Sequence, residues 1–281
     1  MRRPIIIGNW KMHTTLADAM VLTETLLHGL EHIEGIDLVI CPPFPWLYPV
    51  KDALSNGGLK QLQLGAQNVF TEEDGPFTGE VSIRMLKGLV HYVIVGHSER
   101  RYKIGDGEDD QTINKKLKLV LSYGLHPILC VGERVKQVKR GRGRPRLEHG
   151  KDTVEQLKAG LVSVAVHEIP KVIIAYEPVW AIGTGDAATA EYANEQTGRL
   201  RHALQNWYGT EVAETTRIIY GGSTDSENAP QFMGQDGIDG LLPGGASLKA
   251  SEFILMGKEV ATSKQAIKEE RVYEVPIKRA G

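Results

Sequence analysis

Short apolar runs recur along the chain, and each is followed by polar or glycine residues and then by a longer amphipathic stretch. Such runs are typical of buried strands. The chain holds eight of them: Pro4–Gly8, Ile36–Cys41, Leu62–Ala66, Tyr92–Val95, Pro127–Val131, Lys171–Tyr176, Arg217–Tyr220 and Gly237–Leu242. Apolar residues recur at helical spacing in five of the longer stretches: Thr15–Leu30, Asp110–Tyr123, Asp152–Val166, Tyr192–Trp207 and Ala246–Val260.

Strands that alternate with helices predict an α/β protein with a parallel sheet. Eight such units in 281 residues predict a single-domain (β/α)₈ barrel. A doubly wound open sheet is the rival architecture. It is disfavoured because no Gly-x-Gly-x-x-Gly motif opens a helix after the first strand.

The composition fits one domain of this size, because 41% of the residues are hydrophobic and the net charge is only −2. That charge gives the chain as a whole no attraction for nucleic acids or membranes.

Cys41 and Cys130 each end an apolar run, which predicts buried free thiols and a reducing compartment. The apolar runs are too short for a signal peptide or for a membrane span of about 20 residues. We therefore expect a soluble, cytoplasmic protein.

We expect the barrel to occupy residues 1–261, with a basic insertion at 134–147 and a C-terminal extension at 262–281. The insertion contains Arg142-Gly143-Arg144-Pro145, which is similar to the core of a minor-groove-binding hook. One short basic match arises readily by chance, so we favour a solvated insertion and expect no nucleic-acid partner. Two alternatives stay open for the extension, namely disorder and packing on a neighbour.

Residues directly after the strands of a barrel lie on its active-site face. Glu177 follows the sixth apolar run, and Pro178 prevents the strand from continuing in register. A lone carboxylate beside a small glycine-punctuated loop can act as a general base that the loop shields from water. Lys11 follows the first run and could bind a phosphate as a point charge, with Asn9 beside it.

His97 follows the fourth run, beside a predicted helix start with Ser98 as its cap. The N-terminal end of a helix favours a neutral imidazole, which donates a hydrogen bond without carrying charge. Glycine pairs follow the last two runs, at Gly221-Gly222 and Gly244-Gly245, and expose backbone N–H groups suited to a phosphate. The sequence contains no metal-binding spacing and no serine-nucleophile motif. A base, a neutral imidazole, a lysine and a phosphate-binding pair of glycine turns together predict proton abstraction beside a carbonyl of a small phosphorylated sugar.

Five motifs, in order, resemble the triosephosphate isomerase family: Gly8-Asn9-Trp10-Lys11-Met12, Gly96-His97-Ser98-Glu99-Arg100-Arg101, Ala175–Gly185, Tyr220-Gly221-Gly222-Ser223 and Gly244-Gly245-Ala246-Ser247-Leu248. The resemblance runs from about Pro4 to about Val260. It implies a TIM barrel and a cofactor-independent, metal-free isomerase of glycolysis and gluconeogenesis, which interconverts D-glyceraldehyde 3-phosphate and dihydroxyacetone phosphate through an enediol(ate). This family is itself the standard example of a base, a neutral histidine and a closing loop acting together.

The resemblance also implies a role for each matching residue. Glu177 would move the proton, His97 would polarise the carbonyl, and Lys11 with Asn9 would stabilise negative charge on the substrate. The phosphate-binding residues would be Gly183, Ser223, Gly244 and Gly245. The lid and its apolar clamp would comprise Pro178, Val179, Trp180, Ala181, Ile182, Thr184 and Leu242. Ile182 and Leu242 would desolvate Glu177 and raise its basicity, and Tyr220 with Ser223 would latch the closed lid.

Members of this family are usually homodimers, and the segment 67–79 resembles the loop that inserts into the partner subunit. In that case Thr78 would approach the partner's Asn9, and Glu80 would pair with the partner's Arg100. Pro243 departs from the family's usual valine and offers no N–H, but the implied phosphate donors are the residues after it. Two other functions stay open: isomerisation of a four-carbon ketose phosphate, and non-catalytic phosphate or nucleic-acid binding.

Overall fold

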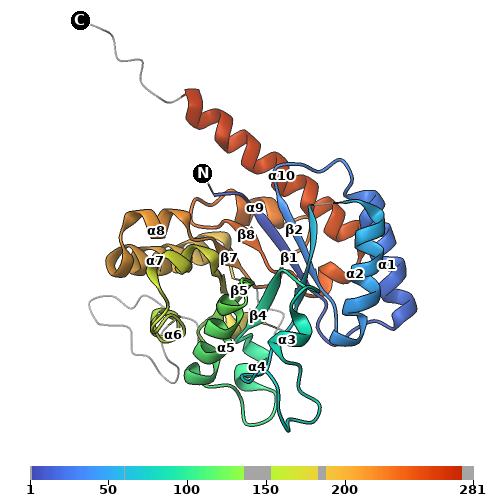
Figure 1. Cartoon of the computed structure of the whole chain (residues 1–281). Helices are drawn as coiled ribbons and strands as arrows, with labels where there is room; N and C mark the ends of the chain where they lie inside the picture. The colour runs from blue at the N-terminus through green and yellow to red at the C-terminus, as the bar shows by residue number, and fades with distance from the viewer. Residues whose placement is uncertain (1, 60, 136–152, 183–187, 274–281) are drawn as a thin grey trace, which may run out of the picture.

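The computed structural model describes residues 2–59, 61–135, 153–182 and 188–273, with side chains as far as residue 263. Eight parallel strands close into a barrel in sequence order, and helices surround it (Figure 1). The strands are β1 Ile5–Asn9, β2 Asp37–Cys41, β3 Leu62–Ala66, β4 Tyr92–Val95, β5 His126–Val131, β6 Ile173–Tyr176, β7 Ile218–Tyr220 and β8 Gly240–Leu241. Each lies at an apolar run of the sequence, so the predicted (β/α)₈ barrel is confirmed.

The described helices include several that the sequence pattern did not predict. The α-helices are α1 Leu16–Gly29, α2 Leu47–Gly57, α3 Ile83–Leu86, α4 Ser98–Tyr102, α5 Asp110–Ser122, α6 Thr153–Gly160, α7 Ala190–Tyr208, α8 Thr210–Thr215, α9 Ala229–Met233 and α10 Ala250–Tyr273. Short 3₁₀ helices are η1 Phe44–Trp46, η2 Val166–Lys171, η3 Val179–Ala181 and η4 Gly245–Leu248. No helix in the described part of the chain combines the length and apolarity of a membrane span.

The predicted boundaries of two helices were wrong, at the C-terminal end of Asp152–Val166 and at both ends of Ala246–Val260, where the α-helix begins only at Ala250. α6 ends at Gly160 rather than at Val166, because Asn114 of α5 donates hydrogen bonds to the carbonyls of Gly160 and Val162 and stops the helix there. Ser163 then adopts a left-handed conformation, with φ of 59°. At the other end of the chain α10 continues to Tyr273, so the first half of the extension at 262–281 is helical and projects past the barrel (Figure 1).

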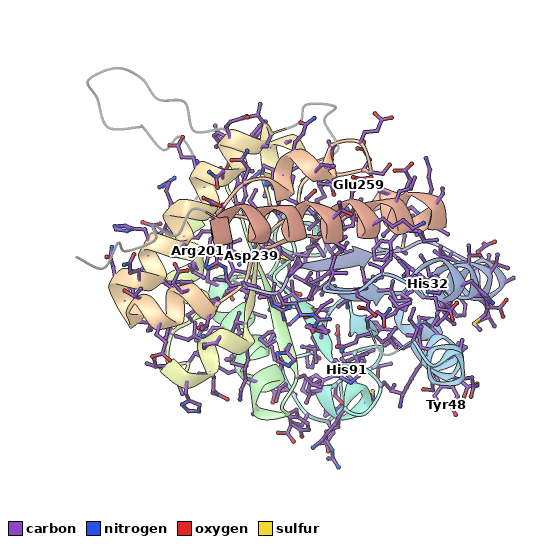
Figure 2. All side chains as sticks on the ribbon, turned by 90° about the horizontal axis from the view of Figure 1, so that it is seen from above. His32, Tyr48, His91, Arg201, Asp239 and Glu259 are labelled. Carbon is purple, nitrogen blue, oxygen red and sulfur yellow. The ribbon has the colours of Figure 1, made fainter. Side chains whose placement is uncertain are left out.

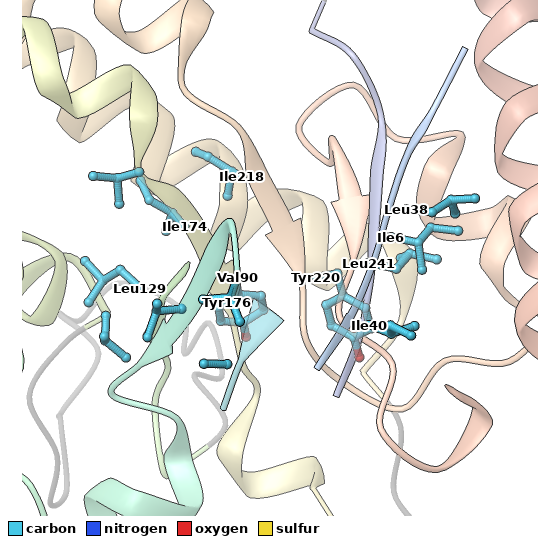
Figure 3. Close-up of a cluster of buried hydrophobic side chains, with 14 of the residues drawn as sticks. Ile6, Leu38, Ile40, Val90, Leu129, Ile174, Tyr176, Ile218, Tyr220 and Leu241 are labelled. Atoms are coloured by element: carbon cyan, nitrogen blue, oxygen red, sulfur yellow. The ribbon is translucent and has the colours of Figure 1, made fainter. Parts of the chain in front are cut away.

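The strands are buried on both faces, as a parallel sheet covered by helices requires. Alternate residues fill the barrel interior, among them Ile5, Val39 and Ile94. The residues between them face outward and pack under the helices, as Figure 3 shows for Ile6, Leu38, Ile40, Leu129, Ile174, Tyr176, Ile218, Tyr220 and Leu241. The predicted thiols are also buried, because Cys41 and Cys130 are free cysteines inside the barrel.

A buried ion network holds the first and last strands together at the N-terminal end of the barrel. Asp239, which precedes β8, accepts hydrogen bonds from Arg2 Nε at 2.7 Å and from Arg201 Nη2 of α7 at 2.6 Å (Figure 2). It also accepts from the backbone N–H of Ile218 in β7 at 2.8 Å. One 5%-exposed carboxylate therefore ties α7 to β7, β8 and the segment before β1.

We predict that Asp239→Ala lowers the free energy of unfolding by about 3–5 kcal/mol, because it leaves the largely buried Arg201 guanidinium without its counter-charge. The matched control is Glu168→Ala, which breaks the surface ion pair with Lys171 and should change stability little. Urea titrations followed by circular dichroism measure both. Equal shifts of the two urea midpoints would contradict the stabilising role of Asp239 at the N-terminal end of the barrel.

Candidate active site

A pocket of about 380 Å³ opens at the C-terminal ends of the strands. It collects residues that are far apart in the sequence, as expected for the mouth of a (β/α)₈ barrel. The predicted site residues that line it are Asn9, Lys11, His97, Ile182, Ser223, Leu242, Gly244 and Gly245. Gly183 and Thr184 lie outside the described residues.

Glu177 follows β6 directly and does not itself line this pocket, because only 1% of the residue is exposed, but it lies against His97, which does line it. Glu177 Oε2 accepts a hydrogen bond from the backbone N–H of Ser98 at 2.9 Å. Its Oε1 is buried, and no N–H or O–H group in the described part of the chain meets hydrogen-bond geometry with it. One carboxylate oxygen is therefore fixed by a hydrogen bond, and the other has the His97 ring as its polar neighbour.

His97 places its ring beside that oxygen, with Nε2 2.9 Å from Glu177 Oε1. Its Nδ1 accepts a hydrogen bond from the backbone N–H of Glu99 at 3.2 Å, so the neutral ring carries its proton on Nε2. His97 is thus the N-cap residue of α4. The prediction of Ser98 as the cap was wrong, because the imidazole nitrogen reaches the free N–H that a serine hydroxyl usually satisfies.

Lys11 is held in a left-handed backbone conformation, with φ of 52°. The side chain of Asn9 accepts from its N–H at 3.0 Å, and the Gln67 amide donates to its carbonyl at 2.8 Å. Such strain at a non-glycine residue persists only where neighbouring groups fix it, and it is common at functional sites. Lys11 Nζ forms an ion pair with Glu99 at 2.8 Å.

The second glycine pair lies under the Lys11 side chain. A Cβ added to Gly244 would lie 3.2 Å from Lys11 Cε and 3.7 Å from Nζ. None of the hydrogen bonds between described residues uses the backbone N–H of Ser223, Gly244 or Gly245. Pro243 does not disturb this geometry, because its carbonyl accepts from the Asn9 N–H at 2.9 Å. Three free N–H groups and one ammonium therefore converge, as an anion site requires.

The predicted lid segment begins with ordered structure, since Val179, Trp180 and Ala181 form η3 after Pro178. Glu133, which follows β5, anchors it. Glu133 Oε1 accepts hydrogen bonds from Trp180 Nε1 at 2.9 Å, Tyr176 Oη at 2.7 Å and Tyr192 Oη at 2.9 Å. Burial and the Glu133 charge raise the pKa of the Tyr176 hydroxyl, so it acts as a donor to this carboxylate.

A family model described as triosephosphate isomerase matches residues 4–260, which is almost the whole chain. The chain belongs to the triosephosphate isomerase family. Among its relatives is a triosephosphate isomerase of Dehalococcoides mccartyi, 48% identical over 261 residues that cover 93% of this chain and 98% of that protein. Triosephosphate isomerases of Carboxydothermus hydrogenoformans and Thermoanaerobacter pseudethanolicus are 44% and 45% identical over 92% and 90% of this chain, and the matches cover 99% and 98% of those proteins.

Sequence reasoning missed three polar side chains of this triosephosphate isomerase site. Glu133 could have been found by a slightly wider form of the rule that found Glu177, because only Gly132 separates it from the end of β5. Gln67 follows β3 directly, but it was assigned only to the predicted intersubunit loop. Lys103 lines the pocket from the C-terminal end of α4, and no signal in the sequence places its side chain there.

A glycine makes room for Glu177 in this isomerase fold. A Cβ at Gly132 would lie 1.7 Å from the carbonyl oxygen of Glu177. We therefore predict that Gly132→Ala displaces the Glu177 backbone and lowers kcat by about 100-fold or more, since misplacement of about 1 Å has that effect. Gly198→Ala is the control, because a Cβ there meets nothing within 4 Å. Steady-state kinetics of both variants check this, and a fully active Gly132→Ala enzyme would contradict it.

Proposed function

We propose that this chain interconverts D-glyceraldehyde 3-phosphate and dihydroxyacetone phosphate through an enediol(ate), with Glu177, His97 and Lys11 as its catalytic residues. The family match over residues 4–260 supports the reaction. The observation that supports the residue roles is the juxtaposition of the Glu177 carboxylate and the His97 imidazole at 2.9 Å, beside a pocket with free backbone N–H groups.

Glu177 removes the proton from the carbon beside the substrate carbonyl and returns it to the neighbouring carbon. The hydrogen bond from the Ser98 N–H to Oε2 supports this role because it keeps the carboxylate in place, and Oε1 lies against the His97 ring. Burial of Cys130 raises the pKa of its thiol, and the charge of Glu177 raises it further. The neighbouring thiol therefore stays protonated and does not compete as a base.

His97 donates the proton on Nε2 in a hydrogen bond, first to the carbonyl oxygen and then to the enediol oxygens. The hydrogen bond that Nδ1 accepts supports this tautomer. Lys11 and Asn9 stabilise the negative charge that develops on the substrate. The N–H groups of Ser223, Gly244 and Gly245 bind the phosphate, and by resemblance to the family so does that of Gly183.

The segment from Pro178 to Thr184 acts as the lid, and Tyr220 with Ser223 latches it when closed. Two observations support a hydrophobic clamp on Glu177. Ile182 and Leu242 both line the pocket. A Cβ at Gly221 would lie 3.0 Å from Glu177 Cγ and 3.6 Å from Leu242 Cδ2, so Leu242 lies close to the base. A dry base and a shielded enediol suppress elimination of the phosphate.

We predict that Glu177→Gln lowers kcat by about 100- to 10,000-fold with a much smaller change in KM, because an amide cannot accept the substrate proton. A coupled assay with D-glyceraldehyde 3-phosphate measures it, and circular dichroism controls for folding. Full activity of Glu177→Gln would overturn the assignment of the base. Absence of turnover by the native chain would favour the non-catalytic phosphate-binding alternative.

The four-carbon alternative involves the same chemistry and a longer substrate. Comparison of kcat/KM for D-glyceraldehyde 3-phosphate and for a four-carbon ketose phosphate separates the two, because kcat/KM measures discrimination between competing substrates. A higher value for the triose supports our proposal, and a higher value for the tetrulose phosphate overturns it.

We propose further that the chain forms a homodimer through residues 67–79, with Thr78 near the partner's Asn9 and Glu80 near the partner's Arg100. Exposed apolar side chains of the first three β/α units support this interface. Met12 is 94% exposed, Tyr48 72%, Met85 60% and Phe77 40%. Residues 136–147 of the basic insertion lie outside the described residues, and we propose no nucleic-acid or membrane partner. The free buried cysteines support a cytoplasmic location.

We predict that Phe77→Glu weakens the dimer by at least about tenfold, because it places a charge where the apolar loop would be buried against the partner. Val162→Glu is the matched control, since Val162 is 54% exposed and lies after α6, away from that loop. Sedimentation velocity over a range of concentrations measures both. A Phe77→Glu dimer as stable as that of Val162→Glu would contradict the interface.

A further inference from the structure

Among the described residues, two lysines line the active-site pocket, and they differ in their partners. Lys11 Nζ is paired with Glu99 Oε1 at 2.8 Å. Lys103 is exposed and lies within ion-pair distance of no carboxylate in the described part of the chain. Before substrate binds, the uncompensated positive charge on these two lysines is therefore that of Lys103, whereas Lys11 is already neutralised.

Lys103 is well placed to reach the same carboxylate as Lys11. Glu99 lies in the first turn of α4, and Lys103 is the C-cap residue four positions later, with its N–H bonded to the Glu99 carbonyl at 2.8 Å. Side chains four residues apart lie on one face of a helix, and a glutamate that precedes a lysine by four positions is the favourable order. Both side chains line one pocket.

Substrate binding creates a problem for Glu99. When Lys11 turns toward the anionic substrate, the Glu99 carboxylate loses its hydrogen-bonded counter-charge. The Glu99 side chain is only 30% exposed, so water replaces that partner incompletely. A negative charge left facing an arriving phosphate dianion would also repel it.

We propose that Lys103 pairs with Glu99 when Lys11 engages the substrate, so that the ion pair passes from one lysine to the other. This inference rests on the proposed function and adds a positioning residue to it. Lys103 does not touch the reacting atoms. It lowers the free-energy penalty for releasing Lys11, and it keeps the charge of Glu99 compensated beside the bound dianion.

The electrostatics of the free site support the exchange. Burial raises the pKa of Glu99, and the hydrogen bond from Lys11 with the charges of Lys11 and Lys103 lowers it by more. The pKa of this carboxyl is therefore below its ordinary value, and Lys103 already contributes to that without direct contact. Glu99 stays ionised near neutral pH, so it needs a cationic partner in both states.

The test uses Lys103→Met, Lys103→Arg and a matched control. We expect Lys103→Met to weaken binding of inorganic phosphate, measured by calorimetry, and to raise KM for dihydroxyacetone phosphate, each by about fivefold, with kcat changed less than twofold. Lys103→Arg retains the cation and should restore both values. Lys118→Met removes an equal charge from an exposed position on α5 that does not line the pocket, and it should change neither.

A double-mutant cycle with Glu99→Gln separates this exchange from simple attraction of anions. If Lys103 acts through Glu99, Lys103→Met should change phosphate affinity less than twofold in the Glu99→Gln background. An effect of equal size in both backgrounds, or no effect in the native background, would overturn the proposal. Phosphate affinity is measured without turnover, so an inactive native chain would count against the proposed function and not against this inference.

Discussion

The buried carboxylate of Glu177 is the group on which the rest of the site depends. Burying an unpaired charge is unfavourable, so each neighbouring element contributes to keeping this one in place. Ser98 at the start of α4 donates a backbone hydrogen bond to one oxygen, and His97 lies against the other. Gly132 and Gly221, at the ends of β5 and β7, have no Cβ and therefore allow the Glu177 backbone and side chain to approach closely.

Most of the fold follows from the hydrophobic pattern, because strands buried on both faces appear as continuous apolar runs. Two of the missed helices are too short to show helical spacing, since α9 spans only Ala229–Met233 and α3 only Ile83–Leu86. α2 Leu47–Gly57 is long enough, with Leu47 and Val50 buried, and was overlooked. The end of α6 could not be found either, because Asn114 stops it from a neighbouring helix. A tertiary contact of this kind leaves no mark in the local sequence.

The candidate site divides in the same way. Residues directly after strands could be predicted, since the barrel brings those positions to one face. The hydrogen bonds between these side chains and the rest of the structure could not be predicted. Glu133 binds Trp180 and Tyr192, which lie 47 and 59 residues away in the sequence. The imidazole cap of α4 and the location of Lys103 also depend on rotamers and helix ends that residue types alone do not specify.

The most direct test of the central claim is the fate of the carbon-bound hydrogen during turnover in D₂O. A carboxylate that carries the proton between two carbons exchanges it with solvent when the pocket opens. Proton NMR of dihydroxyacetone phosphate incubated with the native chain should therefore show deuterium replacing hydrogen on the carbon beside the carbonyl, and Glu177→Gln should abolish this exchange. Isomerisation to equilibrium without deuterium in the substrate would mean that hydrogen moves directly between the carbons, and it would contradict the account.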